Sequence, residues 1–243
     1  MAKLSIHTDE KKSKISRNIY GNFSEHLGRC IYNGIYVGEN SDIPNINGMR
    51  TDIVEALKAI KLPVLRWPGG CFADEYHWKD GIGPKDRRPV RPDMAWSTIE
   101  PNQVGTDEFL RWCERTGIEP MLAVNLGTGT PKDAVELLEY CNGSAHTYWA
   151  DKRRENGHDA PYNVRLWCLG NEMDGSWQIC AKTAAEYGRI ACETAKLMKM
   201  LDPDIELVAC GSSFRAMPTF GAWEEEVLRQ CYPYIDYLSL HQY

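Results

Sequence analysis

Residues 164–175, VRLWCLGNEMDG, decide how this 243-residue chain is interpreted. The stretch opens with apolar residues, breaks at Gly170, and then presents the side chains of Asn171 and Glu172. A buried strand that ends in an amide and a carboxylic acid is typical of a (β/α) barrel, which carries its chemistry at the C-terminal ends of its strands. A plain strand followed by a polar turn also fits these letters, because Gly-Asn and Asp-Gly are ordinary turn formers. The remaining sequence decides between the two interpretations.

Short apolar stretches alternate with amphipathic helical patterns along the chain. We expect strands near residues 19–24, 62–67, 120–127, 164–169, 205–213 and 235–243. Helices are expected near 51–60, 106–116, 130–142, 183–201 and 223–231, with Thr51 or Asp52, Thr106, Thr130 and Thr183 at their starts. Polar loops are expected at 33–50, 79–105 and 143–161. Apolar strands that alternate with helices predict an α/β fold with a parallel sheet, and Ile19 and Phe23 are expected to be buried in its first strand.

Polar side chains follow the end of each expected strand. They are Glu25, Cys71, Asn125, Asn171 with Glu172, Ser212 with Ser213, and His241. This pattern favours a barrel over an open doubly wound sheet, and no G-x-G-x-x-G follows a strand. Because six strands are two fewer than a closed (β/α)8 TIM barrel has, we expect a fragment truncated to about the first six βα units. An intact open sheet is the alternative.

Composition limits the classes of function. The net charge of −6 argues against nucleic-acid binding, and no apolar stretch predicts a targeting signal or a membrane span, so we expect a cytoplasmic protein without nucleic-acid or membrane partners. The nine cysteines are odd in number and form no C-x-x-C pair. Most lie in apolar runs, such as Cys113, Cys168, Cys192 and Cys210, which indicates free thiols and not a disulfide framework or a zinc site.

Five sequence blocks carry a family resemblance: NIYGNFSEHLGRCIYNGI, PVLRWPGGCFADEYHWKDGIGP, EPMLAVNLGTGTP, LGNEMDGSWQI and YLSLHQY. Together they resemble the α-L-arabinofuranosidases of glycoside hydrolase family 51. The resemblance implies a (β/α)8 barrel with the acid/base on strand four and the nucleophile on strand seven. It also implies an accessory β-sandwich to which residues 1–14 contribute a strand around Leu4 and Ile6, a partial barrel over 15–243, and a homo-oligomer such as a hexamer.

The resemblance also implies roles for residues near the first four strands. Glu172 matches the general acid/base, and Asn171 matches the neighbour that hydrogen-bonds the sugar 2-hydroxyl. Glu25 matches a carboxylate that holds arabinofuranose hydroxyls. Cys71 stands where many relatives have Asn, and some Cys. Arg66 resembles the strand-two arginine that orients the nucleophile.

Further roles follow from the same resemblance. Trp96 and Trp177 resemble aromatic walls of the sugar pocket, while His241 and Tyr243 match residues that flank the nucleophile's site. The nucleophile is a Glu at the end of strand seven in the family, so we expect it beyond residue 243. Trp96 as a plug of its own loop, and His241 as a core histidine, are the structural alternatives.

The chemistry of a retaining glycosidase needs two carboxyl groups about 5–5.5 Å apart and no metal or organic cofactor. We expect walls from Trp167 and Trp177, together with a second carboxylate, to raise the pKa of Glu172 so that it is a proton donor. Asp74, Glu75 and Asp174 are expected to form salt bridges and are the only other source of a second catalytic carboxyl in the chain. A bridge from Glu25 to Arg29 or His26 is the structural alternative to a sugar contact.

These observations predict an exo-acting, retaining α-L-arabinofuranosidase for the parent protein. Its expected substrates are oligosaccharides derived from arabinoxylan or arabinan. Three alternatives remain at this point: a truncated, non-catalytic polypeptide with at most sugar binding, another clan member such as a xylanase or β-glucosidase, and an inverting hydrolase that pairs Glu172 with Asp74 or Glu75.

Overall fold

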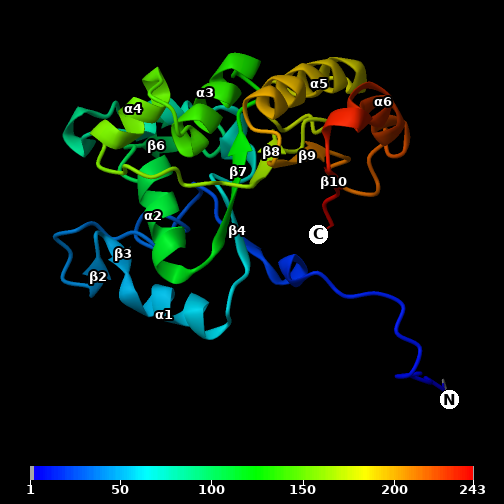
Figure 1. Cartoon of the computed structure of the whole chain (residues 1–243), viewed down its shortest axis with the longest axis horizontal. Coiled ribbons are helices and arrows are strands. Elements are labelled where there is room, and N and C mark those ends of the chain that lie inside the picture. The colour runs from blue at the N-terminus through cyan, green and yellow to red at the C-terminus, as the bar shows by residue number, and fades with distance from the viewer. Residues whose placement is uncertain (1–2, 243) are drawn as a thin grey trace.

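A six-stranded parallel sheet forms the centre of the computed structural model, which describes residues 3–242 (Figure 1). The strands lie side by side in chain order, and each of the five pairings is parallel. Their bounds are Asn22–Phe23 (β1), Val64–Trp67 (β4), Glu119–Val124 (β7), Leu166–Leu169 (β8), Glu206–Cys210 (β9) and Tyr237–Ser239 (β10). A doubly wound sheet reverses its strand order at a switch point, whereas this sheet does not. The prediction of part of a barrel with six strands is therefore confirmed.

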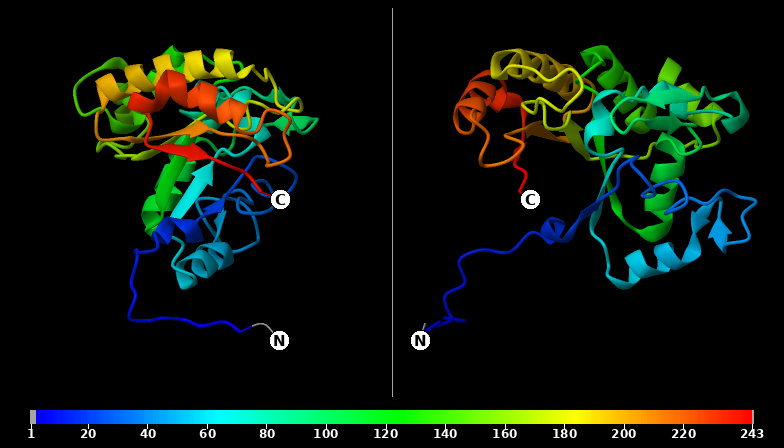
Figure 2. Two further views of the ribbon diagram at one scale, coloured as in Figure 1. Left: turned by 90° about the vertical axis from the view of Figure 1, so that its right-hand side faces the viewer. Right: turned by 180° about the vertical axis from the view of Figure 1, so that it is seen from behind.

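Helices cover the outer side of the curled sheet, as the two views of Figure 2 show. They are Thr51–Ala59 (α1), Thr106–Thr116 (α2), Pro131–Asn142 (α3), Tyr148–Glu155 (α4), Ala184–Leu201 (α5) and Ala222–Cys231 (α6). Two small hairpins extend the loops: Asn45–Ile46 (β2) with Met49–Arg50 (β3), and Arg91–Asp93 (β5) with Thr98–Glu100 (β6). The 3-10 turns are Arg17–Tyr20 (η1), Cys71–Asp74 (η2), Trp78–Gly81 (η3), Lys85–Arg87 (η4) and Tyr232–Tyr234 (η5).

Capping residues set the helix ends largely as the sequence predicts. Thr130 and Thr183 form reciprocal capping boxes with Asp133 and Glu186, so that backbone donors in the first turn are satisfied. Gly117 ends α2 in the left-handed conformation. Thr51 and Thr106, expected as caps, are instead the first residues of α1 and α2.

Helix α4 was not predicted, because residues 143–161 were expected to be a polar loop. Its segment YWADKRRE carries charges on most sides, so no apolar stripe marks it as a helix. A buried cation holds it in place: the guanidinium of Arg153 donates to the carbonyls of Tyr140, Gly143, His158 and Asp159 at 2.8–3.2 Å. The helix is thus fixed by tertiary hydrogen bonds that a periodicity argument does not detect.

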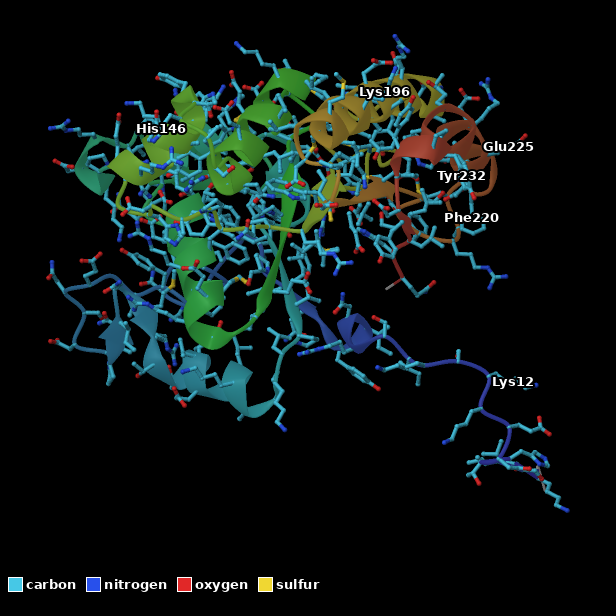
Figure 3. All side chains as sticks on the ribbon, viewed as in Figure 1. Lys12, His146, Lys196, Phe220, Glu225 and Tyr232 are labelled. Carbon is cyan, nitrogen blue, oxygen red and sulfur yellow. The ribbon has the colours of Figure 1, made fainter. Side chains whose placement is uncertain are left out.

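The N-terminal segment differs from its predicted structure. Residues 3–16 contain no strand, and the side chains of Leu4 and Ile6 are 86% and 78% exposed. Figure 3 shows Lys12 on this segment, extended away from the body of the protein. The membership of the segment in a second domain stays a prediction.

Ile19 and Phe23 are 66% and 51% exposed, so their predicted burial is wrong. Ile19 lies in η1 and not in a strand. Phe23 lies on β1, at the edge of the sheet, and its ring faces the guanidinium of Arg66 at 5.4 Å. An edge strand of two residues has a neighbour on one side only, which leaves its side chains open to solvent.

All nine cysteines are free thiols, as expected, and six of them are buried. None of the helices between residues 3 and 242 is long and apolar enough to cross a bilayer.

Candidate active site

A cavity of about 600 Å³ lies at the C-terminal ends of the central strands. Its lining residues are Phe23, Glu25, Arg66, Gly70, Cys71, Trp96, Asn171, Glu172, Trp177, Phe214, His241 and Gln242. Eight of the nine site residues named from the sequence therefore meet in one place. The ninth, Tyr243, lies outside the described residues. The carboxyl ends of parallel strands meet at one edge of a sheet, which explains the convergence of residues 25 to 241.

Glu172 stands directly after β8 and is held at both carboxylate oxygens. The indole Nε1 of Trp177 donates to Oε2 at 2.8 Å, and Nδ1 of His241 lies 2.7 Å from Oε1. The side chain of Glu172 is only 7% exposed. Its backbone has a φ of +45°, which is uncommon for a residue other than glycine. His241 thus lines the cavity beside Glu172 and does not lie in the apolar core, while its role toward a sugar stays a prediction.

Asn171 and Arg66 form a second polar pair in the cavity. Nη2 of Arg66 donates to Oδ1 of Asn171 at 2.9 Å. Arg66 comes from β4 and Asn171 follows β8, so the bond crosses β7 and fixes both side chains above the sheet.

Glu25 faces the cavity and does not bridge to its sequence neighbours. Its Oε1 accepts from Nε1 of Trp96 at 2.8 Å and from the backbone N–H of Phe72 at 3.3 Å. His26 instead lies 2.7 Å from Glu100. Gly69, with φ of +126°, makes room for this arrangement, because a Cβ there would lie 2.4 Å from that of Glu25.

The Trp96–Glu25 hydrogen bond joins the β5–β6 hairpin to the site. Trp96 is 42% exposed, so its ring is an open wall of the cavity and not the plug of its own loop. The hairpin is fastened a second time where Glu100 meets His26 and accepts from the Tyr32 hydroxyl. Two sets of hydrogen bonds therefore hold the long loop of residues 79–105 so that Trp96 lines the cavity.

Cys71 lines the cavity as a neutral thiol. Burial, and then the nearby carboxylates of Glu25 and Glu172, raise the pKa of Cys71 to about 12. A thiolate is the reactive form of cysteine, so this position is not activated as a nucleophile.

Asp74, Glu75 and Asp174 do not form the predicted salt bridges with any cation in residues 3–242. Each accepts hydrogen bonds from backbone N–H groups instead: Asp74 from Leu126 and Asn171, Glu75 from Met94 and Ala95, and Asp174 from Ser213. Burial raises the pKa of Asp74 to about 7. None of the three lines the cavity, so they supply no second carboxyl beside Glu172, and the inverting alternative loses its partner.

Other expectations about strand ends need correction. The indole of Trp167 points to the helix side, where its Nε1 donates to the carbonyl of Val164, so it is not a wall of the site. Asn125 and Ser213 are used in turns, through hydrogen bonds to Thr128 and Asp174. None of these residues lines the cavity.

Phe214 and Gln242 line the cavity but were missed from the sequence. Phe214 comes two residues after Ser212, and its ring lies 6.1 Å from that of Trp177. Its position in the loop after the fifth strand was the available signal. No group of three or more His, Cys, Asp or Glu side chains in the described part of the chain is arranged to hold a metal ion.

Comparisons with known proteins show the family to which the chain belongs. The family model of the α-L-arabinofuranosidase 1 domain matches residues 56–243. An intracellular exo-α-(1→5)-L-arabinofuranosidase of Acetivibrio thermocellus is 52% identical over 242 residues, which are 100% of this chain and 48% of that protein. The α-L-arabinofuranosidase C of Emericella nidulans is 49% identical over 99% of this chain and 49% of its own length. The chain thus spans about half the length of the curated relatives it matches.

Two solved structures share the fold closely. The α-L-arabinofuranosidase of Thermotoga maritima, in complex with arabinose, has a TM-score of 0.89 and 52% identity over 93% of this chain and 46% of that one. A family 51 α-L-arabinofuranosidase of Bifidobacterium longum has a TM-score of 0.91 and 45% identity over 93% of this chain and 45% of its own. With a matching family model and relatives near 50% identity, this chain belongs to the family 51 α-L-arabinofuranosidases.

Proposed function

We propose that the protein carrying this chain is an exo-acting, retaining α-L-arabinofuranosidase. It releases terminal arabinofuranosyl residues from arabinoxylan- or arabinan-derived oligosaccharides. The observation that carries the proposal is Glu172, a nearly buried carboxyl group held by Trp177 and His241 inside a cavity with hydrogen-bonding groups suited to a sugar. The names of the relatives support the same activity.

In this mechanism, Glu172 donates its proton to the glycosidic oxygen as the bond to the anomeric carbon breaks. A second carboxylate attacks that carbon and forms a glycosyl-enzyme intermediate, and Glu172 then takes a proton from the water that hydrolyses it. Among residues 3–242, Glu25 is the other carboxylate in the cavity, and it is occupied by Trp96 and Phe72. We therefore expect the nucleophile from a Glu beyond residue 243.

Replacing Glu172 by Ala at the full encoded length of the protein tests the acid/base role. We expect kcat to fall about 10²–10⁴-fold on an arabinofuranoside with a poor leaving group, as for other lost acid/base groups. Azide should restore turnover of an activated aryl arabinofuranoside by attacking the intermediate in place of water. Unchanged activity would remove Glu172 from the mechanism.

A second candidate applies to the 243 residues alone. Because the described cavity contains no free second carboxylate, we expect this polypeptide to bind arabinose without turning over substrate. Calorimetric titration with arabinose and a long incubation with an aryl arabinofuranoside test both parts. Measurable turnover would contradict it. Products from arabinan compared with xylan separate an arabinofuranosidase from a xylanase.

We also propose a cytoplasmic location and a homo-oligomeric state, such as a hexamer, for the whole protein. Relatives from Acetivibrio thermocellus and Bacillus subtilis are named intracellular, which supports the location. Cell fractionation tests the location, and light scattering of the full-length protein tests the oligomer. Secretion, or a monomer at micromolar concentration, would contradict the respective proposal.

A further inference from the structure

Asp74 is a fully buried carboxylate just below the cavity, and it joins three strand ends. Its Oδ1 accepts from the N–H of Leu126 at 3.2 Å, and its Oδ2 accepts from the N–H of Asn171 at 3.0 Å. Oδ2 also accepts from Nε2 of Gln178 at 2.7 Å. Asp74 itself comes shortly after β4, Leu126 follows β7, and Asn171 follows β8. The carboxylate thus ties together three adjacent strands, β4, β7 and β8, at the ends that carry the site.

Gln178 completes the connection from the other side. It is 4% exposed, and its Nε2 donates to the carbonyl of Cys71 at 3.2 Å as well as to Asp74. Its Oε1 lies 3.4 Å from Nδ2 of Asn171. Both the backbone and the side chain of Asn171 are therefore held by the Asp74–Gln178 pair, while neither member of the pair lines the cavity.

The turn that this pair supports is strained. Gly170 has a φ of +84° and Glu172 a φ of +45°. A left-handed backbone at a residue with a side chain persists only where its surroundings force it. A Cβ at Gly170 would lie 3.2 Å from Oδ1 of Asp74, so the carboxylate packs directly against this turn. Releasing the N–H of Asn171 allows the peptide to rotate and Glu172 to relax to a negative φ, which turns its carboxyl away from Trp177 and His241.

We propose that Asp74 and Gln178 are positioning residues that hold the strained turn and thereby aim the carboxyl group of Glu172 at the glycosidic oxygen. The proposal rests on the proposed function, because it assigns Glu172 as the proton donor. Asp74 is fully buried and does not line the cavity, so it is not placed to contact a bound sugar. It acts on the reaction only through Glu172, because it sets the direction in which the carboxyl group of Glu172 points.

Leaving-group dependence tests positioning separately from stability. A misaimed acid slows a substrate whose leaving group needs the proton, such as phenyl α-L-arabinofuranoside, but hardly slows the 2,4-dinitrophenyl compound, whose leaving group departs without one. The variants are Asp74→Asn and Gln178→Met, both close in shape to the native residues. Asp107→Asn is the matched control, because Asp107 is also a buried carboxylate, held by the hydroxyls of Tyr140 and Tyr162 away from the cavity.

For Asp74→Asn at full length, we expect kcat/KM to fall about 100-fold on the phenyl substrate and less than about fivefold on the dinitrophenyl substrate. Gln178→Met should show the same split with a loss of about tenfold on the phenyl substrate, and it serves as the test if Asp74→Asn does not fold. Asp107→Asn should lower thermal stability without any split between the substrates.

An equal loss on both substrates, or no loss, for the Asp74 and Gln178 variants overturns the proposal. So does a split of the same size in Asp107→Asn. Failure of the proposed function is a different result: the unaltered protein then hydrolyses neither arabinofuranoside, or Glu172→Ala itself shows no dependence on the leaving group.

Discussion

The two faces of the sheet differ in what their side chains do. On the helix side, Trp167 is fully buried and packs in the main apolar cluster beside its register partners Leu122 and Leu207. On the concave side, the next residue, Cys168, packs in a small cluster with Ala73, Ala123 and Val208, against which Met121 also lies. The large side chains thus stabilise the fold, whereas the small ones leave room for the cavities and for the site at their rim.

The largest loss of stability should come from removing a large buried side chain on the helix side of the sheet. Trp167→Ala removes a fully buried indole and its hydrogen bond to Val164, so the free energy of unfolding should fall by about 3–5 kcal/mol. Cys168→Ala, one residue along the same strand, should cost only about 1 kcal/mol because the atom removed is small and its cluster is small. Urea unfolding of both variants measures the difference. Equal losses would contradict the division between the two faces.

The second largest loss of stability is expected from replacing the buried cation Arg153 on the helix side. Arg153→Met leaves four carbonyl groups around α4 without their donor and should cost about 3 kcal/mol. Arg153→Lys is the control: it keeps the charge but not the planar fork, so it should recover only part of the loss. Thermal unfolding of the two variants measures this, and full recovery by Lys would show that charge alone holds the helix.

The sequence predicts most of the fold for reasons that particular residues illustrate. Thr130 and Thr183 mark helix starts through hydrogen bonds to residues three positions further along the chain, so the sequence alone reveals them. Site residues from 25 to 241 converge because parallel strands bring their ends to one edge. Local chemistry and sheet topology were enough for both predictions.

The errors have a common cause in tertiary contacts. The apolar stretch around Trp167 has no polar residue to show which face each side chain takes, so its direction was not predictable. Helix α4 depends on carbonyls from 140 to 159 that converge on Arg153. Asp74 was expected in a salt bridge, but its donors come from residues 126, 171 and 178. The donors to Asp74 lie 52 to 104 residues away in the sequence, whereas the partners of Arg153 lie only 5 to 13 residues away but are brought together by loops without a periodic pattern.

The buried carboxyl group of Asp74, below the site, should make the free energy of unfolding depend on pH. Burial raises the pKa of Asp74 to about 7 from an ordinary 3.8, so the folded chain keeps a proton that the unfolded chain has lost. Stability from this group is therefore present below pH 3.8 and is lost as the pH rises to about 7. Asp74→Asn should flatten this part of the curve of unfolding free energy against pH. An unchanged slope would show that Asp74 is ionised throughout the range.

The smallest effect on stability is expected from replacing Phe23 on the edge strand β1. The same change should have a separate effect on sugar binding. Phe23 is 51% exposed on β1, so Phe23→Ser should lower the free energy of unfolding by no more than about 0.5–1 kcal/mol, the contribution of an exposed cation–π contact. Its ring nevertheless lies 5.4 Å from the guanidinium of Arg66 and lines the cavity. Losing the ring removes an apolar wall of the cavity against which a bound sugar can pack, so arabinose binding should weaken about two- to fivefold. Phe23→Tyr retains the ring and is the control. Calorimetric titration and urea unfolding of both variants measure the two effects, and a loss of stability without a loss of affinity would place Phe23 with the structural residues of the helix side.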